Sequence, residues 1–230
     1  MAKGLREIFF EIAPAYERVN RVLTLGLDRG WREAAARTAA GAGGSRWLDV
    51  CSGTGDMARA LAARAPAGTS LSALDFCPPM LRRAAARDAA HRISFVLGNA
   101  ASLPFPDASF DLLTVSFATR NLNLFPGALR ETCGEFRRVL RPGGVYVNVE
   151  TSRPPAAIVR LAFRVYVRLF VRPLGRLFSG ADAGYAYLAA SIPRFYSAEE
   201  LAGILKEAGF SKVTFRRLLL GAAAVHRSVR

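Results

Sequence analysis

The sequence is poor in the residues that most often build metal sites and disulfide frameworks. Its 230 residues include only three cysteines and two histidines. Cys51, Cys77 and Cys133 are scattered, without a C-x-x-C pair or any other metal-ligand spacing. We therefore expect no metal site and no disulfide framework, and a reducing cytosol as the compartment.

Long apolar runs are also missing. A helix that spans a bilayer needs about 20 consecutive apolar residues, and no segment approaches that length without charges. The first residues, MAKGLREIFFEIAPAYERV, place acidic and basic side chains through any apolar stretch, which is not the pattern of a signal peptide. We expect a cytoplasmic protein that is either free or bound at the inner face of the membrane.

Lysine is scarce, so arginine carries nearly all of the positive charge. Of the 32 basic residues only Lys3, Lys206 and Lys212 are lysines, and with 18 acidic residues the formal net charge is +14. This balance suits nucleic acid, anionic lipid or an acidic small molecule, and a GC-rich genome also favours arginine. Because the arginines are dispersed and no aromatic-rich basic motif accompanies them, we expect no nucleic-acid partner.

The main positive signal is an alternation of β-rich runs and helical patterns between residues 45 and 150. The expected strands are 46–51, 70–76, 93–99, 110–118 and 144–150. The helical patterns are 56–65, 78–90 and 126–140. Strands joined by crossover helices form a parallel, doubly wound α/β sheet. The apolar strand 110–118 is expected at its centre, covered on both faces.

The length predicts a single domain with additions. Residues 1–44 form an N-terminal helical cover, 45–150 the core, 151–193 an insert, and 194–230 a closing helix with two last strands, 212–220 and 222–229. Ser197 and Glu200 have the spacing of a capping box at the start of the closing helix, and Gly209 marks its end. We expect the cover and the insert to enclose a substrate.

The loop after the first strand has the G-x-G-x-x-A spacing of a nucleotide-binding loop at Gly53, Gly55 and Ala58. In an open parallel sheet, ligands bind beyond the carboxyl ends of the strands. Asp49 precedes this loop and Asp56 follows it, and two carboxylates would repel a pyrophosphate. S-adenosylmethionine, whose methionine end carries an ammonium and a sulfonium, fits these charges better than NAD does.

Further cofactor candidates follow the next strands. Asp75 is placed to accept hydrogen bonds from a ribose diol. Asn99 and Ala100 are placed to contact the adenine edge, and Ser116 to line the methionine side. Each of these residues also has a purely structural explanation, so the hypothesis depends on the loop, Asp49 and Asp75 together.

Eight stretches and a short C-terminal piece resemble one family. They are IAPAYERVNRVLTLGLDRGWR, WLDVCSGTGD, LDFCPPML, NAASLPFPDASFD, TVSFATRNL, ALRETCGEFRRVLRPGG, DAGYAYLAASIPRF, EELAGILKEAGF and GAAAVHR. Through them the chain, from about Phe10 to Arg227, resembles the quinone-biosynthesis C-methyltransferases, that is, the demethylmenaquinone and 2-polyprenyl-6-methoxy-1,4-benzoquinol methyltransferase family. LDVCSGTGD and LRPGG occur in many class I methyltransferases, whereas AYERVN, SFATRN and YAYLAASI resemble this family in particular.

This resemblance implies a seven-stranded, mostly parallel, Rossmann-like class I methyltransferase fold with S-adenosylmethionine as cofactor. It implies C-methylation of a polyprenylated quinol, either demethylmenaquinol, the benzoquinol precursor of ubiquinone, or both. The cofactor positions of the family fall on residues already considered and on one more within the glycine loop. They are Thr54, Asp75, Asn99, Ala100 and Ser116.

A quinol carbon becomes nucleophilic when a neighbouring hydroxyl is deprotonated, so the site must favour a phenolate. We expect Arg120 to stabilise this anion, Asn121 to orient a ring oxygen and Tyr16 to contact the acceptor. Arg120 could instead only pair with an acid. His226 is a second candidate base, although a structural histidine on the last strand is the favoured interpretation.

The sequence departs from the family pattern mainly on the acceptor side. Ala118 and Thr119, Thr151, Asp28 and the single Gly221 replace its usual residues. A class I methyltransferase for another small molecule therefore stays an alternative. An RNA methyltransferase and an NAD oxidoreductase are further alternatives, although the N-P-P-Y-type motif of base-amino methyltransferases is absent from the sequence.

The insert contains a basic amphipathic pattern. Its arginines recur every fourth position at Arg160, Arg164, Arg168 and Arg172, so they cover about a third of a helix circumference. Such a helix can lie on an anionic membrane. Alternatively its apolar side packs on the sheet or on a second subunit of a homodimer, and the arginines face water.

Overall fold

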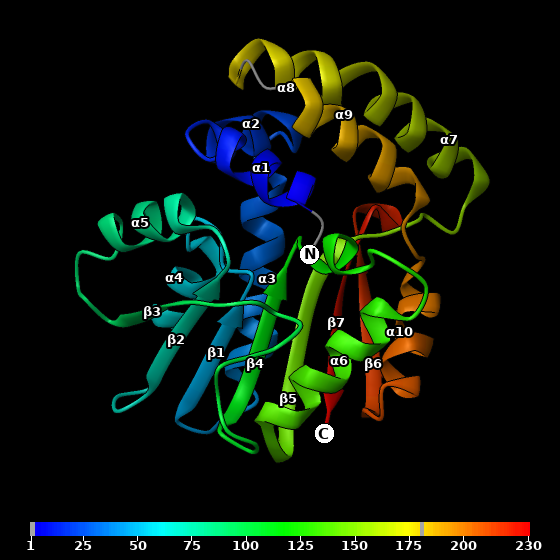
Figure 1. Cartoon of the computed structure of the whole chain (residues 1–230). Coiled ribbons are helices and arrows are strands. Elements are labelled where there is room, and N and C mark those ends of the chain that lie inside the picture. Colours follow the sequence, from blue (N-terminus) through cyan, green and yellow to red (C-terminus); the bar gives the residue numbers. More distant parts are fainter. Residues whose placement is uncertain (1–2, 180–181) are drawn as a thin grey trace.

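The computed structural model describes residues 3–179 and 182–230, and its centre is a seven-stranded sheet (Figure 1). The strand order is β3-β2-β1-β4-β5-β7-β6. Neighbouring strands from β3 to β5 are parallel, and β7 runs antiparallel to both β5 and β6. The prediction of a mostly parallel, doubly wound sheet is confirmed, with β4 at its centre.

The strands are β1 Arg46–Val50, β2 Ser70–Asp75, β3 Ile93–Leu97, β4 Phe110–Ser116, β5 Leu140–Thr151, β6 Ser211–Leu218 and β7 Ala223–Val229. The helices are α1 Lys3–Ile12, α2 Tyr16–Leu23, α3 Leu27–Ala40, α4 Asp56–Ala62, α5 Pro78–Ala86, α6 Ala128–Val139, α7 Ala157–Tyr166, α8 Arg172–Ser179, α9 Asp182–Ser191 and α10 Ala198–Glu207. A π-helical turn, Val167–Val171, joins α7 to α8. A 3₁₀ turn, Thr119–Leu122, follows β4.

The fifth strand differs from its expected bounds. It begins directly after α6, four residues earlier than predicted, and the R-P-G-G segment interrupts its pairing with β4. Phe110 pairs with Leu140, and Leu112 with Val145, so the segment bulges out of the ladder. Gly143 adopts a φ of 78°, which suits glycine in such a bulge.

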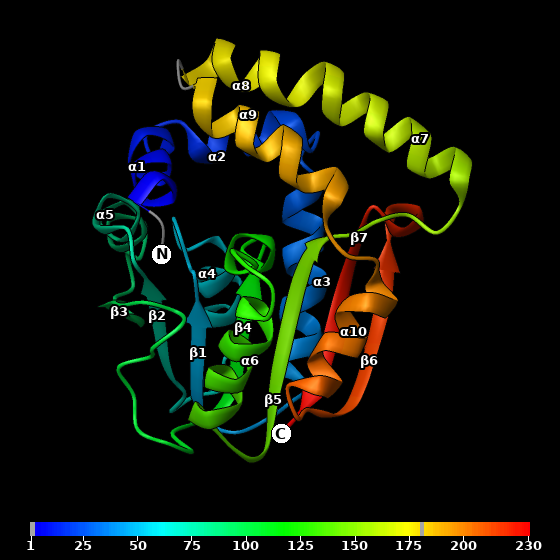
Figure 2. The same ribbon diagram turned by 45° about the vertical axis from the view of Figure 1, so that its right-hand side comes forward.

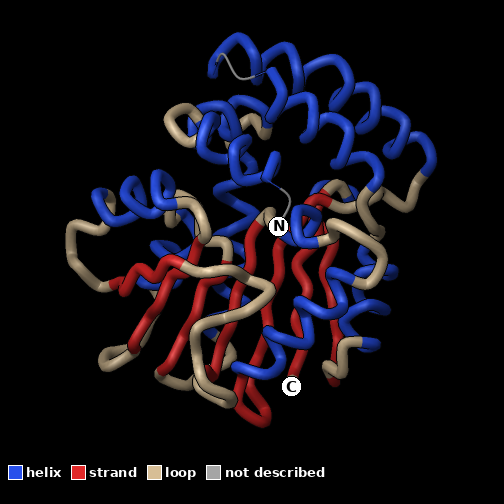
Figure 3. Tube along the Cα trace, viewed as in Figure 1, coloured by secondary structure: helices blue, strands red, loops and turns tan. Residues whose placement is uncertain are grey.

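The central strands are apolar on both faces because helices cover both faces of the sheet (Figures 1 and 3). Leu48 and Leu113 pack on the side of α6 and α10. Trp47 and Leu112 pack on the opposite side, against α3 and α4. The expected capping box of α10 is present, since Ser197 Oγ accepts from the amide of Glu200 at 3.2 Å and the Glu200 carboxylate accepts from the amide of Ser197 at 2.8 Å.

Five helices form a cap over the carboxyl ends of the parallel strands (Figure 2). They are α1 and α2 from the N-terminal segment and α7, α8 and α9 from the insert, and they share one apolar cluster that includes Ile12, Val19, Val167 and Tyr185. Segments more than a hundred residues apart thus close one end of the sheet. No helix within the described residues has the length and apolarity to cross a bilayer.

Candidate active site

A cavity lies at the carboxyl ends of β1, β2 and β4, under the first cap helices. Its walls include six of the residues predicted from the sequence: Tyr16, Gly53, Asp75, Ala100, Ser116 and Asn121. Apolar side chains that the sequence analysis did not single out complete them: Phe9, Phe76, Met80, Phe117 and Leu122. The cavity therefore combines an apolar wall with a few polar groups, as ligand sites commonly do.

The glycine loop is held against the end of β2. The amide of Gly53 donates to Asp75 Oδ2 at 2.8 Å, and the amide of Cys77 donates to Asp75 Oδ1 at 2.9 Å. Burial raises the pKa of Asp75 to about 6, although these backbone donors act to lower it. Gly55 has a φ of 78°, and a Cβ there would lie 3.0 Å from the Cβ of Ala84, so the turn requires glycine.

Asp49 lies at the end of β1 and is completely buried. Its Oδ1 accepts from Thr114 Oγ1 at 2.6 Å, whereas Oδ2 has no hydrogen-bond partner in the described part of the chain. Burial raises the pKa of Asp49 to about 7, opposed by the Thr114 hydrogen bond and by the positive charge of Arg32. A buried carboxylate oxygen without a donor is costly, and Asp49 is not among the residues that line this cavity.

The carboxylate of Asp56 is directed away from this cavity. It accepts from Arg87 Nη2 at 2.7 Å and from Thr54 Oγ1 at 3.1 Å, and it lies 3.8 Å from Arg59 Nη1. The expectation that Asp56 directly attracts the cationic cofactor is therefore not supported, because arginines already balance its charge. Thr54 and Gly55 shape the loop without lining the cavity.

The two residues expected at the adenine edge are placed differently. Ala100 lines the cavity and is buried. The Asn99 side chain is exposed, and its Oδ1 accepts from the amide of Ala101 at 3.1 Å. Asn99 thus stabilises the turn after β3 rather than reaching into the cavity.

Arg120 follows β4 in the 3₁₀ turn and is paired with an acid. Its Nη1 donates to Glu150 Oε1 at 2.7 Å, and both side chains are buried. The same oxygen accepts from the amide and the hydroxyl of Thr151, at 2.8 and 2.9 Å. Glu150 was not among the residues expected at the site. The pattern of apolar residues along the sequence does not predict that this acidic side chain is buried at the end of β5.

Arg120 lines a second cavity that adjoins the first. Tyr16 and Phe117 belong to the walls of both. Asp28, Arg32 and Thr151 line the second cavity as well. Two of the departures from the family pattern, Asp28 and Thr151, therefore lie beside Arg120, on the side expected to receive the methyl acceptor.

Asn121 is oriented by a residue of the cap. Tyr187 Oη, on α9, donates to Asn121 Oδ1 at 3.3 Å, and burial raises the pKa of Tyr187, which keeps its hydroxyl protonated. The Asn121 Nδ2 makes no hydrogen bond with the described residues, so it can donate to a ligand in the first cavity. A buried bond of 2.6 Å from Thr119 Oγ1 to Asn148 Oδ1 holds the turn that carries both Arg120 and Asn121.

His226 lies outside both cavities. It is buried on β7, its Nε2 lies 2.9 Å from the carbonyl oxygen of Ala198, and its ring lies 5.5 Å from that of Phe215. Burial lowers the pKa of His226. The structure supports the interpretation of a structural histidine, not of a general base.

Residues 2–230 match the model of the ubiE/COQ5 methyltransferase family. The demethylmenaquinone methyltransferase of Thermus thermophilus is 41% identical over 223 residues, which are 95% of this chain and 98% of that protein. The enzyme of the same name from Roseiflexus castenholzii is 39% identical, covering 100% of this chain and 94% of that protein. The ubiquinone/menaquinone biosynthesis C-methyltransferase UbiE of Dinoroseobacter shibae is 36% identical, covering 95% and 87%.

Solved structures share the fold at lower identity. A SAM-dependent methyltransferase from Aquifex aeolicus has a TM-score of 0.59 at 16% identity, covering 85% of this chain and 88% of that one. Human N-acetylserotonin methyltransferase in complex with SAM has a TM-score of 0.62 at 17% identity, covering 97% and 59%. Because it matches the family model over residues 2–230, the chain belongs to the ubiE/COQ5 methyltransferase family and is an S-adenosylmethionine-dependent methyltransferase.

Proposed function

We propose that this methyltransferase transfers the methyl group of S-adenosylmethionine to a ring carbon of a prenylated quinol, with demethylmenaquinol as the first candidate acceptor. The supporting observation is the pair of adjoining cavities that share Tyr16 and Phe117. The first contains Asp75 and Gly53 of the glycine loop, and the second contains Arg120. The enzymes named above as relatives act on demethylmenaquinone or in ubiquinone and menaquinone biosynthesis.

The residues of the first cavity fit S-adenosylmethionine. Asp75 would accept from the ribose hydroxyls, Ala100 would border the adenine, and Ser116 the methionine side. The partnerless oxygen of Asp49 would accept from a cationic donor. When bound, the cofactor supplies an electrophilic methyl group on a sulfonium.

With the cofactor bound in the first cavity, a quinol ring in the second cavity would receive the methyl group at a ring carbon. Adenosylhomocysteine would be the leaving group, and the proton of the substituted ring carbon would pass to solvent. A quinol phenolate makes the ring carbon nucleophilic, and the Arg120 guanidinium and the Asn121 Nδ2 would stabilise its oxygen. The cap covers the strand ends, and exclusion of water there would strengthen these interactions and favour a reaction that neutralises opposite charges.

Mass spectrometry of the quinones from cells without this gene tests the acceptor. We expect a naphthoquinone one methyl group lighter than the mature quinone to accumulate, and the wild-type gene to restore the mature form. A lighter benzoquinone would identify the ubiquinone step instead. Unchanged quinones of both kinds would contradict the proposal.

We also propose that the outer face of α7 and α8 rests on an anionic membrane. Leu161 and Leu169 are 63% and 58% exposed, and Ile158 is 79% exposed. Exposed arginines are interleaved with them on the same side of the helix, among them Arg164 and Arg168. The opposite side packs inward through Val167 and Val171, so this helix has a second apolar side that the cap does not use.

Vesicles of phosphatidylglycerol and phosphatidylcholine test this face. Changing Arg160, Arg164, Arg168 and Arg172 to Gln should weaken binding on the order of 1,000-fold, since each arginine near such a surface contributes about 1 kcal/mol. Four exposed basic residues elsewhere serve as a control with equal loss of charge: Arg82, Arg92, Arg130 and Arg216. Cosedimentation that falls equally in both variants, or in neither, would contradict a specific membrane face.

A further inference from the structure

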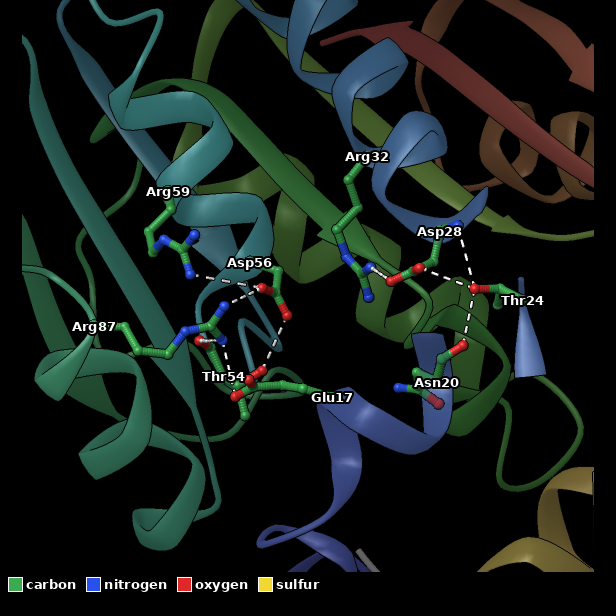
Figure 4. A network of polar contacts seen from close by, with 9 residues as sticks. All are labelled: Glu17, Asn20, Thr24, Asp28, Arg32, Thr54, Asp56, Arg59 and Arg87. Atoms are coloured by element: carbon green, nitrogen blue, oxygen red, sulfur yellow. Dashed lines mark hydrogen bonds and ion pairs between the residues drawn. The ribbon is translucent and has the colours of Figure 1, made fainter. Parts of the chain in front are cut away.

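The second cavity, which Arg120 lines, is polar where α2 and α3 meet. Arg32 Nη1 donates to Asp28 Oδ2 at 2.5 Å, and Thr24 Oγ1 lies 2.9 Å from the other oxygen of Asp28. Figure 4 shows these side chains together with Asn20, whose carbonyl oxygen lies 2.8 Å from Thr24 Oγ1. All of these residues line the cavity. A hydrocarbon chain placed here would separate charged groups from water or from their partners, which is costly.

The wall that the insert contributes to the same cavity is apolar. Val171 comes from the π-helical turn between α7 and α8, Leu188 from α9, and Ile192 from the 3₁₀ turn Ile192–Arg194 that follows α9. Leu23, at the end of α2, lines the cavity as well and belongs to the same apolar cluster. The cavity thus offers charged and polar groups to a hydroxylated ring and an apolar wall to a hydrocarbon chain.

The π-helical turn joins this apolar wall to the outer surface. Val171 is 3% exposed, whereas Leu169 and Phe170 just before it are 58% and 44% exposed. The Phe170 ring stacks on that of Tyr166 at 5.1 Å, and Tyr166 Oη donates to the carbonyl oxygen of Leu23 at 2.6 Å. Contacts therefore run without a break from the cavity wall to the face proposed above to rest on a membrane. Such turns often occur at functional sites.

We propose that the prenyl chain of the acceptor lies against Val171, Leu188 and Ile192 and leaves the cavity beside the π-helical turn, toward the membrane face. The ring then lies on the side of Arg120, and the three apolar residues determine specificity for a chain without taking part in the chemistry. This inference rests on the proposed function, a prenylated quinol as acceptor.

The size of the cavity implies that this wall moves when the acceptor enters. The cavity measures about 70 Å³, whereas ligand sites commonly hold roughly 300 Å³ or more. The wall consists of side chains from the insert, which packs on the N-terminal helices through the apolar cluster of the cap. A chain that enters between them replaces one set of apolar contacts with another, so the wall can yield without exposing charge.

Two acceptors that differ only in the chain test the proposal: 1,4-naphthoquinol and the same ring with a geranyl chain, both kept reduced and assayed without vesicles. Ile192→Trp enlarges a half-buried side chain of the apolar wall. It should raise KM for the geranyl acceptor at least tenfold, because a pocket that loses room for even one methylene group discriminates by about this factor. KM for the ring alone should stay within about twofold.

Ala190→Trp is the matched control, because it adds the same side chain at an exposed position of α9 that does not line the cavity. It should change neither KM. Should Ile192→Trp fail to fold, Ile192→Ala serves in its place and should lower the preference for the geranyl acceptor in kcat/KM about three- to tenfold. Calorimetric binding of adenosylhomocysteine shows that each variant is folded.

The outcomes separate this inference from the proposed function. A KM that changes equally for both acceptors in Ile192→Trp, or for neither, would overturn the assignment of the apolar wall to the chain. Equal kcat/KM of the wild-type protein for the two acceptors would overturn it as well. A wild-type protein that methylates neither quinol would contradict the proposed function itself.

Discussion

Replacing Arg120 by Met together with Glu150 by Gln should lower the turnover number about 100- to 1,000-fold, while the affinity for adenosylhomocysteine stays within about twofold. The loss is that of one preorganised donor to a developing oxyanion. Arg120 lines the second cavity but not the first, so the cofactor should bind nearly as before. Single-turnover kinetics and calorimetry on the same samples measure the two quantities.

The double substitution is needed because Arg120 and Glu150 form a buried pair at 2.7 Å. Arg120→Ala alone would leave the Glu150 carboxylate buried without its cation, at a cost of about 3 to 5 kcal/mol in the free energy of unfolding. Urea unfolding of the single and the double variant separates this effect from catalysis. Normal turnover in a folded double variant would remove Arg120 from the reaction.

Asp49→Asn should make the unliganded protein more stable at pH 8 and weaken its binding of adenosylhomocysteine at least tenfold. The pKa of Asp49 is raised from its usual 3.8 to about 7 by burial, so the folded state takes up more protons than the unfolded state between these values. The carboxyl group therefore favours folding below about pH 4, and this contribution is lost as the pH rises toward 7. Between pH 5 and this pKa of about 7 lie about two pH units, which correspond to about 3 kcal/mol.

Urea unfolding at pH 5 and pH 8 checks the stability part of this prediction. The advantage of Asp49→Asn over the wild type should grow between these two pH values by up to about 3 kcal/mol. An advantage that does not change with pH would mean that Asp49 is ionised at both values or at neither.

Ligand binding should show the opposite dependence. An ionised Asp49 is the better acceptor for an ammonium, so adenosylhomocysteine should bind the wild type more weakly as the pH falls from 8 to 6. Methylthioadenosine, which lacks the ammonium, should show no such change, and neither should Asp49→Asn with adenosylhomocysteine. Parallel pH profiles for the two ligands would contradict an ammonium contact at Asp49.

Much of the fold follows from local patterns of the sequence. The apolar runs around Trp47 and Leu113 predicted buried strands, and the Ser197 and Glu200 spacing predicted the capping box that the structure contains. Strand ends placed Asp75 and Ser116 at one edge of the sheet, and both line the cavity there. These features follow from the spacing of apolar and capping residues along the chain and from the rule that parallel strands end at the same edge of a sheet.

Side-chain direction in loops was less predictable. Asp56 and Asn99 each lie at the expected end of an element, yet Asp56 turns to arginines and Asn99 to the amide of Ala101. A motif position specifies where the Cα lies. The partners that become available on folding decide where a polar side chain turns.

The sequence by itself determined the family resemblance, the order of strands and helices, and the group of acidic and small residues that fit the cofactor. Only the tertiary structure decided how the remaining polar groups combine. Glu150 meets Arg120 from 30 positions away and Tyr187 meets Asn121 from 66. Such contacts follow no periodic pattern in the sequence. The first forms when β4 and β5 pair, and the second when the cap closes over the strand ends, because buried charges and hydrogen-bonding groups need partners.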